Sequence, residues 1–242
     1  MSLASAVQAA PGVYEGVANV IAAAMLLIEF GMLRQALARD QIRLYMAQSA
    51  LISVLAIVIA ADRNLPDLYA LAGLSAALKV VAVPLVMRRL LGRIDPDIQD
   101  EAPGVAGSQT LSPASAVLAG IVLAAFGFFC FGTLKIHGSA GGLAGNSGAP
   151  ALALALAAAM VLVSFGLMIV RRDVASQAIG FFTLENAISL AALVVASGLP
   201  LILETAFLFD LLVAVVVFGM LIRAHHGQTD SLSSADLTRL RV

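Results

Sequence analysis

The feature that most constrains the fold of this chain is a series of apolar runs, each long enough to cross a membrane. A helix that spans the ~30 Å hydrocarbon core of a bilayer needs about 20 mostly apolar residues. Seven such runs occur, at 13–34, 43–61, 67–88, 112–134, 150–170, 174–196 and 200–222. With 61% hydrophobic and 12% charged residues, the composition is also that of a lipid-embedded chain. The sequence therefore predicts an all-α integral membrane protein with about seven transmembrane helices.

Prolines support the predicted starts of four of these helices. Pro66, Pro113, Pro150 and Pro200 each stand within the first turn of a run. Proline suits that position because the first amides of a helix have no partner inside the helix and because its fixed φ is already helical. We therefore expect helices to begin at or next to these four residues.

The chain divides into four segments on this basis. Residues 1–92 hold the first three helices, 93–149 hold a polar inner loop, the fourth helix and a Gly-rich outer loop, 150–224 hold the last three helices, and 225–242 form a tail.

Two segments of the chain resemble each other: MAQSALIS (46–53) aligns without gaps with TLENAISL (183–190), which places Gln48 over Glu185. Both segments open the second helix of a three-helix group. A tandem repeat of helices 1–3 and 5–7 would explain the match.

Basic residues are distributed unevenly between the predicted loops. Arg63 and Lys135 lie on one side of the membrane, whereas eleven arginines lie on the other: Arg34, Arg39, Arg43, Arg88, Arg89, Arg93, Arg171, Arg172, Arg223, Arg239 and Arg241. Short cytoplasmic loops carry the excess of Lys and Arg. The sequence therefore predicts an outside N-terminus and a cytoplasmic C-terminus.

Ionisable residues within the predicted helices are the first candidates for function. A charge at the bilayer centre costs about 2.5–3.5 kcal/mol on insertion scales, so such residues usually face the bundle interior or a water-filled cavity. At ~1.5 Å per residue, Lys79, Glu185 and Asp210 each lie ~15–18 Å from the start of their helix, which is the middle of the membrane. Glu29 and Glu204 lie nearer helix ends, where their side chains can extend to the interface, and are weaker candidates.

Two interpretations of the midplane charges remain open. Lys79 could neutralise one buried carboxylate as a structural ion pair, which would leave either Glu185 or Asp210 without a cation. Desolvation raises the pKa of a carboxyl and lowers that of a lysine, so such groups can exchange protons. Titratable side chains at one depth are also what a proton path through a membrane requires. The pattern favours a proton path and leaves the ion pair as the alternative.

A proline close to Lys79 predicts an irregular helix. Pro84 has no N–H and so removes the hydrogen bond to the carbonyl of Val80. The helix should loosen there, either around a polar cavity, where protein or water can satisfy the freed carbonyl, or as a passive kink.

Polar residues also accompany Glu185. Asn186 and Ser189 form a polar stripe with it that can hydrogen-bond a neighbouring helix, and Gln48 occupies the matching position in the first unit. We treat Gln48, Asn186 and Ser189 as weaker candidates for the same path, since helix packing alone could account for them.

Other chemistry finds no support in the sequence. The net charge of -1, without long runs of one sign, does not suggest nucleic-acid binding. The single cysteine, Cys130, and three histidines outside the predicted helices do not provide ligands for zinc, an iron–sulfur cluster or haem. The sequence contains no phosphate-binding loop, nucleophile elbow or HExxH motif. We therefore expect no metal, no cofactor, no small-molecule substrate and no catalysis by this chain alone.

The residues around these candidates resemble a known family. IGFFTLENAISLAALVV (179–195) is similar to the Glu-bearing helix of the K-type membrane subunit of respiratory complex I. Three further segments extend the likeness: RLYMAQSALISV (43–54), SAALKVVAVPLVMRRL (75–90) and FDLLVAVVVFGMLIR (209–223). With them, residues 14–240 resemble the E-type membrane subunit of hydrogenase 4 and related group 4 energy-converting hydrogenases, in which the C-terminal half is K-like.

The resemblance implies a role and a set of partners. Glu185 would match the essential intramembrane glutamate of the K-type subunit, Lys79 a buried lysine of the E-type family, and Asp210 an Asp position of the last helix. The K-type subunit has a second glutamate one helix later, where Asp210 occupies only roughly that depth. The chain would be a subunit without metal or redox centre in a prokaryotic inner (cytoplasmic) membrane, beside antiporter-like and H-type subunits, and would contribute to redox-driven proton translocation.

Two other classes of protein fit the same residues. A stand-alone secondary transporter would also use a repeat and midplane charges. A structural spacer between other subunits would use Lys79 and Glu185 to hold its own helices together.

Overall fold

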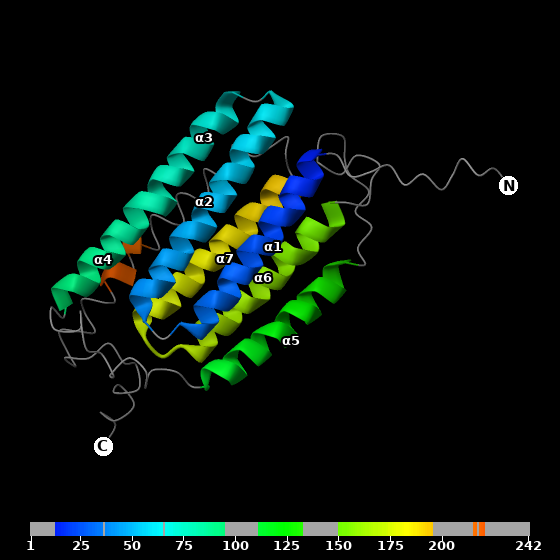
Figure 1. The fold of residues 1–242 in the computed structure, drawn as a ribbon. Helices are drawn as coiled ribbons and strands as arrows, with labels where there is room; N and C mark the ends of the chain where they lie inside the picture. The colour runs from blue at the N-terminus through cyan, green and yellow to red at the C-terminus, as the bar shows by residue number, and fades with distance from the viewer. Residues whose placement is uncertain are drawn as a thin grey trace, which may run out of the picture.

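The computed structural model describes residues 13–35, 37–64, 66–94, 111–132 and 150–195, together with 215–216 and 218–220. The helices are α1 (Val13–Arg34), α2 (Ala38–Arg63), α3 (Pro66–Ala76), a π-helical segment (Ala77–Ala82), α4 (Val83–Ile94), α5 (Pro113–Gly132), α6 (Pro150–Val170) and α7 (Val174–Val195). They pack side by side as a bundle (Figure 1). Six spans within the described residues are long and apolar enough to cross a membrane, with α3, the π-helical segment and α4 forming one of them. The chain is accordingly an all-α membrane protein.

Most helix boundaries follow the sequence. Pro66, Pro113 and Pro150 are the first residues of α3, α5 and α6, as predicted. Two boundaries differ: the third span ends at Ile94 and not near residue 88, and the second helix begins at Ala38 and not near residue 43. The added turns carry charged residues, which a count of apolar residues leaves out although a helix can continue beyond the lipid. Pro200 and most of the predicted seventh helix (200–222) lie outside the described residues.

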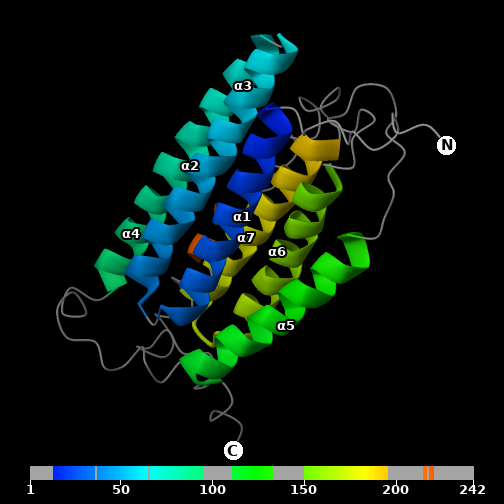
Figure 2. The ribbon, with the colours of Figure 1, turned by 45° about the vertical axis from the view of Figure 1, so that its right-hand side comes forward.

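Four helices form the centre of the bundle, and two further spans flank them. α1, α2, α6 and α7 pack together, α5 lies against α6 and α1, and the α3–α4 span lies against α2 (Figures 1 and 2). α5 approaches α6 closely at Gly127, where an added Cβ would stand 2.9 Å from the Cα of Ala159. Small residues let helix backbones approach this closely in membranes, where no hydrophobic force drives helices together.

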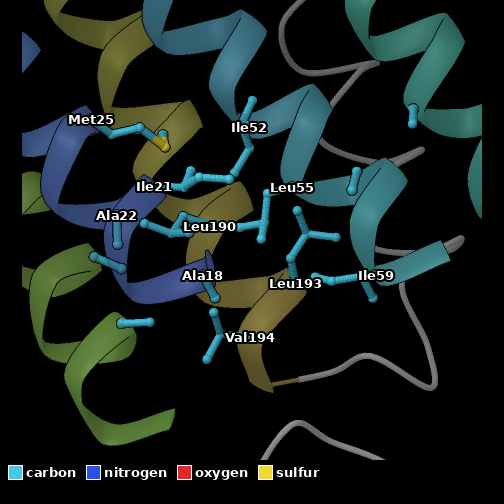
Figure 3. Packing of buried hydrophobic residues seen from close by; sticks show 14 of the residues in the cluster. Ala18, Ile21, Ala22, Met25, Ile52, Leu55, Ile59, Leu190, Leu193 and Val194 are labelled. Atoms are coloured by element: carbon cyan, nitrogen blue, oxygen red, sulfur yellow. The ribbon is translucent and has the colours of Figure 1, made fainter. Parts of the chain in front are cut away.

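Buried apolar side chains form two clusters, one toward each end of the bundle. The first cluster includes Ala18, Met25, Leu55 and Leu190 and joins α1, α2 and α7 (Figure 3). The second cluster includes Met32, Ile42, Leu167 and Phe182. Buried polar residues of α1, α2, the π-helical segment, α6 and α7 lie near the level where one cluster gives way to the other. We call this set the polar layer; it comprises Glu29, Gln48, Ser49, Lys79, Ser164, Thr183, Glu185, Asn186 and Ser189.

The side chain of Arg171 links the turn between α6 and α7 to the end of α1. Arg171 is 1% exposed, and its guanidinium donates hydrogen bonds to the carbonyls of Met32 at 3.2 Å and Leu33 at 3.3 Å and also to that of Gln35. These carbonyls belong to the end of α1, where helical partners are missing and positive charge is favoured. Burial lowers the pKa of Arg171, and the charge of Asp173 partly opposes that shift. This end also carries the ends of α4 and α6 and the starts of α2 and α7. We call it the arginine-rich end, because it also holds Arg34, Arg39, Arg43, Arg88, Arg89, Arg93 and Arg172.

The turns between α1 and α2 and between α6 and α7 resemble each other. Each comprises three residues, and in each a glutamine donates to the carbonyl six residues earlier, Gln41 to Gln35 and Gln177 to Arg171. The residues that match between the two turns, such as Gln41 and Gln177, are one residue closer along the chain than the residues paired in the alignment of 46–53 with 183–190. The likeness agrees with a repeat of these helix pairs, and the full three-helix repeat stays a prediction because its last helix lies largely outside the described residues.

Candidate functional site

The structure brings Lys79 and Glu185 into contact inside the polar layer. The Lys79 Nζ lies 2.7 Å from Glu185 Oε1 and donates a hydrogen bond to Ser189 Oγ at 3.0 Å. The side chains of Lys79 and Glu185 are 0% and 6% exposed. A buried pair of this kind must offset the desolvation of both ions by close geometry and added hydrogen bonds, and Ser189 supplies one of them.

The local irregularity predicted from Pro84 places the lysine. Lys79 lies within the π-helical segment, at the end of which the N–H of Val83 donates to the carbonyl of Leu78, five residues earlier. The regular α-helical bond from Val83 to Lys79 is thereby replaced, and Pro84 has no N–H to offer. The expected loosening of the helix is confirmed and takes the form of a π-helical turn, which widens the helix at the lysine.

The polar stripe beside Glu185 binds α7 to two other helices. Asn186 Nδ2 donates to Gln48 Oε1 at 3.2 Å and to Ser49 Oγ at 2.9 Å. Gln48 Nε2 in turn donates to the carbonyl of Met25 on α1 at 3.4 Å. The predicted candidates Gln48 and Asn186 thus contact each other directly. Ser49, which the sequence analysis did not select, accepts from the same Asn186 amide and could have been found from its place beside Gln48.

Glu29 forms a second buried polar group. Ser164 Oγ on α6 lies 2.5 Å from Glu29 Oε1 and 3.1 Å from Thr183 Oγ1 on α7. Thr183 Oγ1 donates to the carbonyl of Gly180 at 2.8 Å. Glu29 is 0% exposed, and the described residues supply no cation within ion-pair distance of it.

The expectation that Glu29 reaches the membrane interface was therefore wrong. Its distance from the end of α1 is short, as counted from the sequence, but the turn between α6 and α7 covers that end through Arg171. Sequence reasoning also missed Ser164 and Thr183. Isolated hydroxyl residues in apolar helices give little signal, because they often bond a carbonyl of their own helix, as Thr183 does.

An aromatic group lies next to the Lys79–Glu185 pair. The Tyr45 ring is 1% exposed and lies 5.8 Å from that of Phe182, measured between centroids, and its hydroxyl interacts electrostatically with Glu185. Phe218, in the described part of the last predicted helix, packs on Phe181 at 5.9 Å and on Phe182 at 6.1 Å. The last predicted helix therefore contacts α7 at this point. Tyr45 was missed in the sequence, although it precedes Ser49 by one helical turn.

The remaining candidates are less well placed. Asp210 and Glu204 lie outside the described residues. No group of three or more His, Cys, Asp or Glu residues that could hold a metal ion occurs in the part of the chain that the structure describes. The described site thus offers acid–base chemistry through two buried carboxyls and one lysine, with hydroxyl and amide side chains between them.

Comparison with known proteins gives one relative over most of the chain. The uncharacterized protein Rv0085 of Mycobacterium tuberculosis (strain ATCC 25618 / H37Rv) is 30% identical over 168 residues, which cover 68% of this chain and 67% of that protein. No family model and no solved structure matches.

Proposed function

The chain belongs to the same family as the uncharacterized protein Rv0085 of Mycobacterium tuberculosis, and we propose that it carries protons as a membrane subunit of a larger complex. The complex in this proposal is an energy-converting hydrogenase related to respiratory complex I, of the hydrogenase 4 or formate hydrogenlyase type. Other subunits carry out its redox chemistry, and antiporter-like and H-type membrane subunits are the proposed neighbours. The resemblance of residues 14–240 to the E-type subunit supports this choice.

The observation that carries the proposal is the buried contact between Lys79 and Glu185. At a separation of 2.7 Å in a low-dielectric interior, the two side chains attract each other strongly, so the position of Lys79 and the protonation of Glu185 are linked. A proton that reaches Glu185 removes its negative charge and with it the attraction that holds Lys79. Loss of that proton restores the pair. A carboxyl with such a partner can bind and release a proton in response to a small displacement of the lysine.

Two local features support such a displacement. Lys79 already contacts Ser189, one turn along α7 from Glu185, so its ammonium keeps a hydrogen-bond partner when the carboxyl is neutral. The π-helical turn that carries Lys79 has an irregular hydrogen-bond pattern, and such turns in α-helices occur frequently at functional sites.

The test is redox-driven proton pumping by two variants of Glu185. Glu185→Gln preserves shape and hydrogen bonding without an ionisable group, whereas Glu185→Asp keeps a carboxyl slightly displaced. In proteoliposomes with matched subunit content, we expect Glu185→Gln to lose most pH-dye quenching while substrate oxidation by uncoupled complex continues, and Glu185→Asp to retain part. Asp62→Asn, an exposed carboxyl at the far end of α2, serves as the control and should pump normally. Wild-type pumping by Glu185→Gln would favour the structural spacer instead.

Purification in mild detergent tests membership of a complex. We expect nickel- and iron-containing subunits to co-purify with the chain. A monodisperse chain that transports by itself would instead establish the secondary transporter.

A further inference from the structure

Glu29 lies apart from the Lys79–Glu185 pair and is bound in a different way. Its carboxyl is fully buried, and its partner is not a cation but the hydroxyl of Ser164 on α6, which in turn contacts Thr183 on α7. A buried carboxylate without a cation or a full set of donors is costly, and such a group avoids the cost by keeping its proton.

The hydrogens available in this group can be counted. Three contacts form a row: Glu29 with Ser164, Ser164 with Thr183, and Thr183 with the carbonyl of Gly180. Each hydroxyl owns one hydrogen, so Ser164 and Thr183 together supply two. If Glu29 is ionised, one of the three contacts has no hydrogen. If Glu29 is protonated, it donates to Ser164, Ser164 donates to Thr183, and Thr183 donates to Gly180, so that every contact is a hydrogen bond.

No cation on the helices packed around Glu29 neutralises its carboxyl in place of that proton, within the described residues. Within the described residues, α5 and α6 carry no Asp, Glu, Lys or Arg, and no ion pair to Glu29 forms. Arg171 uses its guanidinium on the carbonyls at the end of α1. Among the side chains that the structure describes, the other titratable groups on the packed elements are Arg34 on α1, Arg39, Asp40, Arg43, Tyr45 and Asp62 on α2, Cys130 on α5, Arg172 and Asp173 in the turn before α7, and Glu185 on α7.

The group also has a definite place along the bundle. At ~1.5 Å per residue, Glu29, Ser164, Thr183 and Glu185 lie about 8, 9, 14 and 17 Å from the arginine-rich ends of their own helices. Glu29 is therefore the shallower of the two buried carboxyls, and the hydroxyls occupy the depths between it and Glu185. Its second oxygen, Oε2, is buried and makes no hydrogen bond within the described part of the chain, which adds to the cost of the charged form.

We propose that Glu29, Ser164 and Thr183 form a second proton-binding site, in which Glu29 holds a proton at rest and exchanges it with water. When the carboxyl gives up its proton to water, Ser164 turns to donate to the carboxylate and Thr183 turns to donate to Ser164. The Gly180 carbonyl then loses only its side-chain bond. This role as a proton store beside the Lys79–Glu185 pair rests on the proposed function, whereas binding of the proton itself does not.

Infrared spectroscopy of the full-length chain in lipid nanodiscs tests the site without any other subunit. The wild type should show the carbonyl band of a protonated carboxyl, shifted in D₂O and lost reversibly as the pH is raised. Glu29→Gln, whose amide can still donate to Ser164, should lack this band. Ser164→Ala should keep the band at a shifted frequency because the carboxyl loses its partner, and this variant identifies the band even if Glu29→Gln folds poorly. Glu185→Gln is the matched control and should leave the band in place.

Three outcomes would overturn the site. The band could persist unchanged in both Glu29→Gln and Ser164→Ala, which would assign it to another carboxyl. It could remain unaffected by D₂O and by pH, which would make the proton a fixed part of helix packing. Binding of radioactive Na⁺ to the wild-type chain that is lost in Glu29→Gln would make the group a sodium site. If the band behaves as expected while Glu185→Gln pumps normally, the second site stands and only the function proposed for the Lys79–Glu185 pair fails.

Discussion

Glu185 and Glu29 are both buried carboxyls of the polar layer, yet the bundle accommodates them by opposite means. Glu185 has an ammonium 2.7 Å away, whereas Glu29 has a row of hydroxyls and no cation among the described residues. A cation stabilises the charged form of a carboxyl, and hydroxyls that need an extra hydrogen stabilise the neutral form. One interior can therefore hold one carboxyl ready to accept a proton and another ready to give one.

Glu185 and Glu29 should therefore also differ in how much stability the protein loses when each site is disrupted. An ion pair leaves a bare charge when one partner is removed, while a neutral hydrogen-bonded group leaves only a polar atom. The comparison therefore predicts a large loss of stability when one member of the Lys79–Glu185 pair is removed alone and a smaller loss when Glu29 is replaced by a neutral residue.

Removing the cation should convert the Glu185 site into one like that of Glu29. Lys79→Met preserves bulk and should cost about 3–5 kcal/mol if Glu185 stays ionised. The double variant Lys79→Met/Glu185→Gln should recover most of that loss, because no bare charge remains. The measurement is unfolding by SDS titration in mild detergent. If the double variant is as unstable as Lys79→Met, the charge on Glu185 is not the cause, and the contrast between the two carboxyls fails.

Asn186 connects the helix of Glu185 to α2 and, through Gln48, to the helix of Glu29. Asn186→Ala should cost about 1–3 kcal/mol, since it leaves buried polar atoms of Gln48 and Ser49 without their donor. A double-mutant cycle with Ser49→Ala should show coupling of about 1 kcal/mol. Strict additivity in the same SDS titration would mean that this link does not hold the two sites together.

Two serines provide a matched pair of smaller changes, one at each carboxyl. Ser164→Ala removes the hydroxyl that contacts Glu29 and should cost about 1–2 kcal/mol. Ser189→Ala removes only the second partner of Lys79, which keeps Glu185, and should cost about 0.5 kcal/mol. Equal losses in the two variants would show that Glu29 has further partners and would weaken the argument for its neutral form.

The two sites also differ in how far the sequence could predict them. Lys79 and Glu185 were expected at one depth because lipid fixes the length of a span, so that counting along each helix gives a common coordinate. Pro84 indicated a loosened helix, since proline removes a known hydrogen bond, although not the π-helical form. The burial of Glu29 could not be predicted, because it depends on a turn from the other half of the chain.

The orientation of the bundle decides which carboxyl lies nearer the cytoplasm, and it can be tested without altering stability. The arginine-rich end should be cytoplasmic, which would make Glu29 the carboxyl closer to that side. Single cysteines at Ser2, Ser139 and Ser231 in a Cys130→Ala background can be labelled in intact cells with an impermeant thiol reagent. We expect Ser2→Cys and Ser139→Cys to react and Ser231→Cys to react only after the membrane is permeabilised. Labelling of Ser231→Cys alone in intact cells would show that the bundle has the opposite orientation. A proton from the cytoplasm would then meet the Lys79–Glu185 pair before it met Glu29.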